Sequence, residues 1–107
     1  MIDRSDSLYE TVAALGRVVK DQIPADGKTW EIVRFVGSAA YLAATAVKLV
    51  WDLGGPGEEV IASTHGDANL ELVRQVVGDG TKKLALVLEN DAPAAQMLGG
   101  RYEAREL

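Results

Sequence analysis

The amino-acid sequence predicts an α+β domain: an antiparallel sheet with two helices on one face, in the order α-β-β-β-α-β-β. Three observations support this fold class. Two segments place apolar residues at helical spacing, several short segments are rich in β-branched and aromatic residues, and turns rich in glycine or proline separate them. The chain has 107 residues, so we expect residues 1–107 to form a single domain.

The first expected element is a helix over residues 7–23. Ser7-Leu8-Tyr9-Glu10 has the form of a capping box, in which serine and glutamate satisfy free amides at a helix start. Five apolar residues then follow at spacings of four, three, four and four: Leu8, Val12, Leu15, Val19 and Ile23. This spacing is typical of one apolar helix face. Pro24 disfavours helical geometry in the residue before it and predicts the end of the helix.

Strands are expected next in the chain. Residues 30–36 are rich in β-favouring side chains and predict a strand. Residues 39–53 fit two templates, because their alanines and a narrow polar stripe favour a helix, whereas their alternate residues fit one face of a strand. We assign this segment as a strand because the family described below has a strand at this place, and the helix stays open.

The second helix is expected after a glycine-rich turn at residues 54–57 and a short strand at residues 58–62 that pairs back across this turn. Asp67 can cap this helix, and Gly78 stands where its end is expected. Its buried face would hold Leu70, Val73, Val76 and Val77. Residues 81–89 then predict a central strand, and the charged residues 101–106 predict a strand at the sheet edge.

The composition excludes several functions. Sixteen acidic against eleven basic residues give a net charge of −5, which disfavours nucleic-acid binding. The chain has no cysteine and one histidine, so we expect no disulfide, no metal site and no cofactor. The N-terminus is acidic and polar rather than basic and then apolar, and charges interrupt the apolar residues 35–53. We therefore expect a cytoplasmic protein that does not associate with membranes.

Two parts of the chain carry a family resemblance. In the first, Leu8-Tyr9 opens the expected helix, Ile23-Pro24 closes it, and a strand led by Trp30 follows. In the second, a strand at residues 84–89 and a turn precede Arg101-Tyr102-Glu103. The order of elements resembles that of the YezG-type immunity proteins, small bacterial proteins that neutralise secreted polymorphic toxins, often nucleases. The resemblance implies a non-enzymatic inhibitor that binds one toxin domain and blocks it.

The candidate partner-binding residues are mostly acidic. Four of them lie close in the sequence, near one expected end of the sheet: Asp52, Glu58, Glu59 and Asp67. An acidic patch attracts a basic partner, such as the active-site face of a nuclease, and raises the rate of association. Trp51 joins this set because a partly exposed tryptophan often anchors an interface, whereas a buried one belongs to the core.

Two other functions stay open. The chain could be a small-ligand-binding domain or a small enzyme, with a pocket under a curved sheet and an inward polar group such as Tyr41, Asp52 or His65. It could also form a homodimer through residues 39–53, whose alanines allow close approach. No catalytic residue is predicted, because the polar neighbours of His65 lie too close in sequence to converge as a triad.

Overall fold

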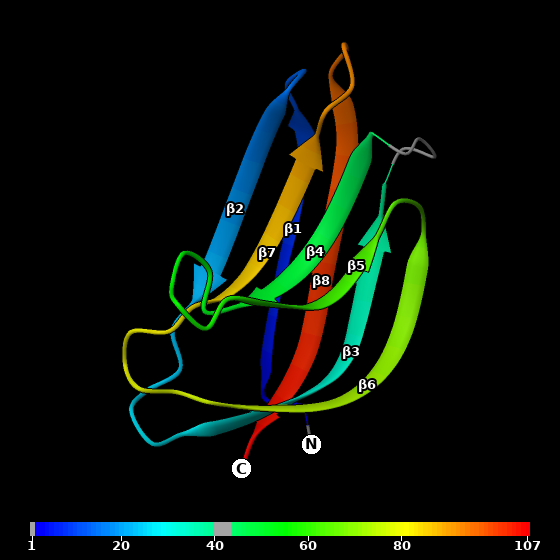
Figure 1. The fold of residues 1–107 in the computed structure, drawn as a ribbon. Helices are drawn as coiled ribbons and strands as arrows, with labels where there is room; N and C mark the ends of the chain where they lie inside the picture. Colours follow the sequence, from blue (N-terminus) through cyan, green and yellow to red (C-terminus); the bar gives the residue numbers. More distant parts are fainter. Residues whose placement is uncertain (1, 40–43) are drawn as a thin grey trace.

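The fold is known from a computed structural model, in which residues 2–39 and 44–107 are described. These residues form eight β-strands and no helix (Figure 1). The strands are β1 (Arg4–Val12), β2 (Gly16–Gln22), β3 (Thr29–Ser38), β4 (Thr45–Trp51), β5 (Glu59–Thr64), β6 (Ala68–Val77), β7 (Leu84–Asn90) and β8 (Gln96–Glu106). The fold is therefore all-β, and the α+β prediction with two helices on one face of a sheet is wrong.

The strands form two antiparallel sheets that pack face to face. Sheet 1 has the order β1-β8-β3-β6, and sheet 2 has the order β2-β7-β4-β5. The chain passes from one sheet to the other at most connections, and β4 and β5 form a hairpin within sheet 2. This layering and strand order are those of a jelly roll.

The core fills the space between the two sheets. Residues alternate between the inner and outer faces of each strand, so every second side chain points inward. The inner residues of β4 and β7 pack against those of β3 and β8. Trp30 and Trp51 belong to this core and are 5% and 7% exposed. The largest fully buried side chains include Tyr102, Phe35, Ile32, Leu49, Leu84 and Leu86.

The segment expected as the first helix forms β1 and β2 instead. A tight turn joins them, in which the Gly16 amide donates to the Ala13 carbonyl at 2.9 Å and Leu15 has a φ of 56°. β1 pairs with β8 in sheet 1, whereas β2 pairs with β7 in sheet 2. Leu8 and Val12 are buried in the core, but Leu15 is 77% exposed. The apolar series therefore spans two strands of different sheets and shares no common face.

The segment expected as the second helix is the strand β6. Its valines are β-branched, and such residues fit a pleated surface better than a helix. Val76 is 3% exposed, whereas Val73 is 84% exposed. The apolar residues therefore do not share one buried face, as a helix would require.

The expected strands agree better with the structure. β3 covers residues 30–36, β5 pairs back on β4 as expected for residues 58–62, and β7 lies between β2 and β4 in sheet 2. Residues 45–51 form β4, so the strand assignment is confirmed there, while residues 40–43, including Tyr41, lie outside the described residues. β8 was expected at an edge but lies between β1 and β3. In the described part of the chain, no helix is long and apolar enough to cross a membrane.

Candidate functional site

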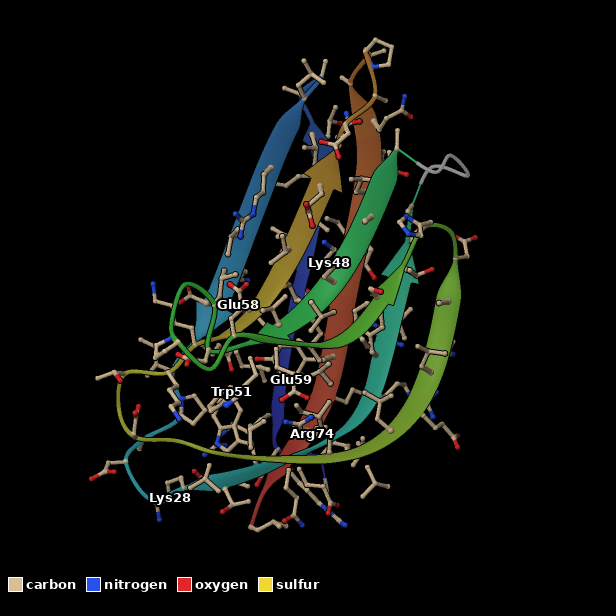
Figure 2. The ribbon with its side chains drawn as sticks, viewed as in Figure 1. Lys28, Lys48, Trp51, Glu58, Glu59 and Arg74 are labelled. Carbon is tan, nitrogen blue, oxygen red and sulfur yellow. The ribbon has the colours of Figure 1, made fainter. Side chains whose placement is uncertain are left out.

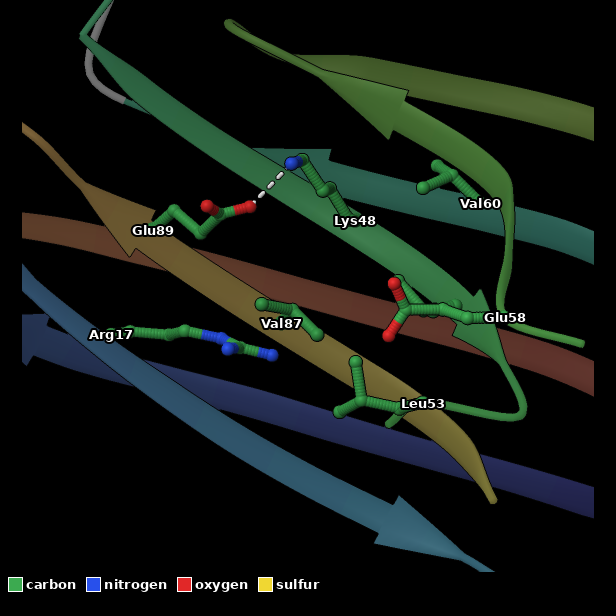
Figure 3. A pocket seen from close by; sticks show the side chains of 8 residues that line it. Arg17, Lys48, Leu53, Glu58, Val60, Val87 and Glu89 are labelled. Atoms are coloured by element: carbon green, nitrogen blue, oxygen red, sulfur yellow. Dashed lines mark ion pairs between the residues drawn. The ribbon is translucent and has the colours of Figure 1, made fainter. Parts of the chain in front are cut away.

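The candidate site is a pocket of about 210 Å³ on the outer face of sheet 2 (Figure 3). Its lining comes from all four strands of this sheet and from residues 52–58, the loop between β4 and β5. It lies outside the core, because its floor residues Val50 and Val87 form a separate apolar cluster.

The floor of the pocket is an apolar cluster on the central strands β4 and β7. Val50, Ala85 and Val87 are 3%, 0% and 2% exposed, although they point away from the core. The sequence of β7, Leu-Ala-Leu-Val-Leu from its first residue, is apolar on both faces. Its leucines enter the core, and its alanine and valine form this second cluster. Leu53, itself partly buried, packs over the cluster from the loop.

The loop at residues 52–58 is held in place by Asp52. Asp52 has a φ of 56°, and its carboxylate accepts a hydrogen bond from the Gly57 amide at 3.0 Å. The Gly55 amide donates to the Asp52 carbonyl at 2.9 Å. A Cβ atom at Gly55 would lie 2.3 Å from the Asp52 carboxylate, so a larger residue there would displace this carboxylate. These contacts fix the loop and position Leu53 over the outer face of sheet 2.

Four charged side chains surround the apolar floor. Lys48 of β4 and Glu89 of β7 form an ion pair of 2.5 Å at one end (Figure 3). Arg17 of β2 extends toward Val87, and its guanidinium makes no ion pair with any described residue (Figure 3). Glu58 points into the pocket from the loop, where one carboxylate oxygen accepts from the Gly54 amide at 2.9 Å.

The chemistry of this pocket suits one apolar group with charges beside it. Val60 offers exposed apolar surface above the floor, Arg17 offers a cation without an ion-pair partner among the described residues, and Glu58 offers a carboxylate with hydrogen-bonding capacity left over. A volume of about 210 Å³ lies below the roughly 300–1,000 Å³ that is usual for small-molecule sites. Within residues 2–39 and 44–107, no cluster of three or more His, Asp or Glu side chains could hold a metal ion.

The structure places only some of the predicted site residues near this pocket. Glu58 lines it. Asp52 lies beneath the loop, is 8% exposed and uses its carboxylate to hold the loop together. Trp51 lies in the core at 7% exposure (Figure 2). Asp52 and Trp51 are therefore not surface residues that a partner could contact directly.

The two remaining acids lie elsewhere. Glu59, at the start of β5, forms a two-pronged ion pair with Arg74 of β6, and this guanidinium lowers the pKa of Glu59 (Figure 2). Asp67 is exposed and follows β5, at the other end of this strand from Glu58. His65, proposed as an inward polar group, is exposed, with Nδ1 2.8 Å from the Thr45 carbonyl oxygen.

Sequence reasoning did not find Arg17, Lys48 or the apolar floor. Arg17 lies within residues 7–23, whose apolar spacing predicts a helix and therefore no place for Arg17 beside β7. The available signal was the sequence of β7, whose two apolar faces require a cover on both sides. One cover is the core, and the other is the loop that carries Leu53.

The outer face of sheet 1 is built differently, because its charged side chains pair with one another. Arg105 donates to Glu31 at 2.7 Å, and Gln75 donates to the other carboxylate oxygen of Glu31 at 3.2 Å. Both hydrogen bonds lower the pKa of Glu31. Arg34 lies between Glu71 and Glu103, at 3.2 and 3.7 Å. A shallow hollow of about 570 Å³ crosses this face, but its charges already have partners.

Comparisons with known proteins bear on the fold. No protein-family model matches the chain, and no curated protein sequence matches it. A solved structure that it resembles is the crystal structure of the Yersinia pseudotuberculosis-derived mitogen (YPM). The TM-score is 0.59 and the sequence identity 13%, over 94% of this chain and 85% of that chain. At this identity the likeness shows a shared fold and nothing about activity.

Proposed function

We propose that this chain is a non-enzymatic protein-binding domain, and that its partner binds at the pocket on the outer face of sheet 2. The observation that carries the proposal is the second apolar cluster, which lies outside the core between Arg17 and Glu58. Protein interfaces have this anatomy, with a small apolar centre inside a polar rim.

The pocket also indicates the chemistry of the partner. One apolar side chain, such as leucine, would pack on Val60 and Leu53, which lie above the buried floor of Val50 and Val87. A carboxylate beside it would accept two hydrogen bonds from the guanidinium of Arg17, which pairs with no other described residue. A lysine or arginine on the other side would reach Glu58. The partner segment therefore carries an acid, an apolar residue and a base on one face.

The inhibitor of a basic toxin domain that the sequence suggested is one form of this proposal. The net charge of −5 and Glu58 support a basic partner, because opposite charges attract over long range. Arg17 and Lys48 in the same pocket favour a partner that also offers an acid. The proposal does not rely on the family resemblance, whose first helix corresponds to β1 and β2. A cytoplasmic location belongs to the same proposal.

The test uses peptides in which the three groups share one face of an extended chain. In blocked Lys-Ser-Leu-Ser-Glu and its reverse, the charged residues and leucine alternate with serine and point to one side. Titrated into the ¹⁵N-labelled protein, one order should give saturable amide shifts at Val50 and Val87. Arg17→Glu and Glu58→Lys should each weaken binding about tenfold, as expected for loss of about 1.4 kcal/mol. Asp91→Lys, at an exposed turn outside the pocket, is the control.

The outcomes separate the two forms of the proposal. If Lys-Ser-Leu-Ser-Lys binds more tightly than either mixed peptide, and Glu58→Lys abolishes this, the basic partner is favoured. If none of the peptides gives saturable shifts at the pocket, or if neither pocket variant changes them, the proposed binding surface is wrong.

A further inference from the structure

The strand β2 forms one margin of sheet 2. It pairs with β7 along one side, and no described strand lies along its other side (Figure 1). Its register with β7 runs from Gly16 opposite Asn90 to Gln22 opposite Leu84 without a shift, so all 7 residues are regular. A strand at a sheet margin presents a row of backbone N–H and C=O groups that can pair with a further strand.

The other sheet margins in the described chain are covered or irregular. At the margin formed by β1, the side chains of Lys20 and Gln22 donate to carbonyls of β1, each at 3.2 Å. In the pairing of β5 with β4, Ile61 has no residue opposite it. In the pairing of β6 with β3, Leu72 and Val73 together face a single residue of β3. Only β2 therefore combines a regular backbone with an uncovered side among these strands.

The outer row of β2 carries two charges without partners. Arg17, Val19 and Asp21 alternate along the strand and share the outer face of sheet 2. Arg17 and Asp21 are exposed, and neither makes a hydrogen bond or an ion pair with a described residue. Val19, between them, is 39% exposed. Lys20 lies on the other face, where its amine is 2.9 Å from the Asp6 carboxylate of β1.

We propose that two copies of this chain pair through β2, antiparallel and around a two-fold axis at Val19. Arg17 of each copy then lies opposite Asp21 of the other copy, and the two Val19 side chains meet at the axis. Opposite charges that face each other across an antiparallel pair stabilise it. The second copy therefore supplies both of the charges that β2 lacks within its own chain. On the inner face Lys20 lies opposite Val18, so no like charges meet.

The register follows from the charge pattern of β2. Side chains that lie opposite each other must share a face, so the two-fold axis passes through a residue. An axis at Arg17, Lys20 or Asp21 would set two like charges directly opposite each other, which destabilises a strand pair. An axis at Val18 would place Arg17 opposite Val19 and leave both charges unpaired. Among the five central residues, only the axis at Val19 pairs opposite charges.

The proposed pairing closes on itself. A two-fold contact uses the same margin of both copies, so the product is a dimer and not a fibre. The two copies of sheet 2 become one continuous sheet. The inference does not rest on the proposed function, although Arg17 also lines the pocket. The second copy and an acidic group in the pocket would compete for this guanidinium, whereas Asp21 serves the dimer alone.

The first test measures the mass of the full chain by sedimentation velocity, from micromolar to millimolar concentration. We expect a concentration-dependent species of twice the 11.4 kDa chain mass, and a weak dimer because a strand of 7 residues is a small interface. Asp21→Arg sets like charges opposite each other twice and should weaken dimerisation about tenfold or more. Asp91→Arg, the same change at an exposed turn, is the matched control and should leave the dimer intact.

The second test exchanges the charges between two variants. Arg17→Asp and Asp21→Arg each set like charges opposite each other in their own dimers, so each alone should be largely monomeric. In an equimolar mixture, a dimer with one copy of each variant restores both opposite-charge pairs. The mixture should therefore sediment faster than either variant at the same total concentration. Unchanged thermal unfolding of both variants confirms that they fold.

The outcomes separate this inference from the proposed function. A monomer at all concentrations, an Asp21→Arg variant that dimerises as the parent does, or a mixture no heavier than its components would each overturn the dimer. None of these results would change the peptide-induced shifts at Val50 and Val87, which test the pocket. Conversely, an absence of peptide binding would leave the dimer measured without peptide as it is.

Discussion

The outer faces of the two sheets differ in how their side chains are arranged against water. Sheet 1 carries charged residues whose partners sit on neighbouring strands, as Arg34 shows between Glu71 and Glu103. Sheet 2 carries an apolar cluster on its central strands and covers it with the loop that holds Leu53. Both faces are in contact with water, but only the second combines a buried apolar cluster with an arginine, Arg17, that has no ion-pair partner in residues 2–39 and 44–107.

This difference teaches where a binding surface can arise on a sandwich. On sheet 1 a partner would have to displace ion pairs that the fold already contains. On sheet 2 the guanidinium of Arg17 has no ion-pair partner among the described residues, and beside it Val60 is half exposed above an apolar floor that Leu53 covers. A partner can therefore pair with Arg17 without breaking an ion pair of the described residues.

The largest expected effect comes from removing part of the apolar cluster on sheet 2. Val87→Ala should lower the free energy of unfolding by about 2 kcal/mol, because it deletes buried carbon atoms and leaves a cavity. Urea denaturation measures the loss. Met97→Ala, on the outer face of sheet 1 and 66% exposed, should change it by less than about 0.5 kcal/mol. Equal effects would mean that the two outer faces do not differ in packing.

A smaller effect is expected from releasing the loop that covers this cluster. Asp52→Ala removes the acceptor of the Gly57 amide and should cost about 1 kcal/mol. Hydrogen exchange of the Gly57 amide should become faster, while amides in β3 should change only with global stability. Asp91→Ala, at an exposed turn, serves as the control. Unchanged exchange at Gly57 would show that Asp52 does not hold the loop.

The smallest effect concerns the ion pairs of sheet 1 and appears only in acid. The folded protein lowers the pKa of Glu31 from its ordinary value of 4.5. The ionised Glu31 carboxylate therefore stabilises the folded protein above about pH 4.5. This stabilisation is lost as the pH falls through the lower pKa that Glu31 has in the folded protein. The thermal midpoint of the parent protein should fall more steeply in this range than that of Glu31→Gln.

In Glu31→Gln the thermal midpoint should still fall in acid, but less steeply than in the parent protein. Glu59 also has a lowered pKa, and three hydrogen bonds from Thr81 and Lys82 lower the pKa of Asp79 to about 2. Glu10→Gln, at an exposed residue of β1, is the control and should show the same fall of the thermal midpoint in acid as the parent. Identical plots of thermal midpoint against pH for the parent and Glu31→Gln would show that ionised Glu31 does not stabilise the protein.

The sequence predicted strands where β-branched residues were dense and failed where spacing was ambiguous. Residues 30–36 contain a tryptophan, a phenylalanine and β-branched residues, and they form part of β3. Residues 7–23 gave helical spacing, but the turn at Gly16 divides them between two sheets. The partner of β1 is β8, which lies some ninety residues away, and no local pattern can show such a pairing.

The site was predictable only in part, for the same reason. Glu58 was found as a surface acid beside a glycine-rich turn. In the sequence Asp52 and Glu59 resemble Glu58. In the fold, however, the Asp52 carboxylate accepts a hydrogen bond within the loop, and the Glu59 carboxylate pairs with Arg74. Arg17 enters the pocket only because β2 lies beside β7 in sheet 2. Distinguishing a free charge from an engaged one requires the strand order.

The pairing of β1 with β8 also constrains how the protein is made. Arg4 lies opposite Ala104, so the first strand finds its hydrogen-bonding partner in the last one. During synthesis, β1 must wait until β8 has left the ribosome. Pairing over such a sequence distance is slow, because loop-closure entropy is lost before the contacts form. β1, the first of the eight described strands to be synthesised, is therefore among the last to form its hydrogen bonds with a neighbouring strand.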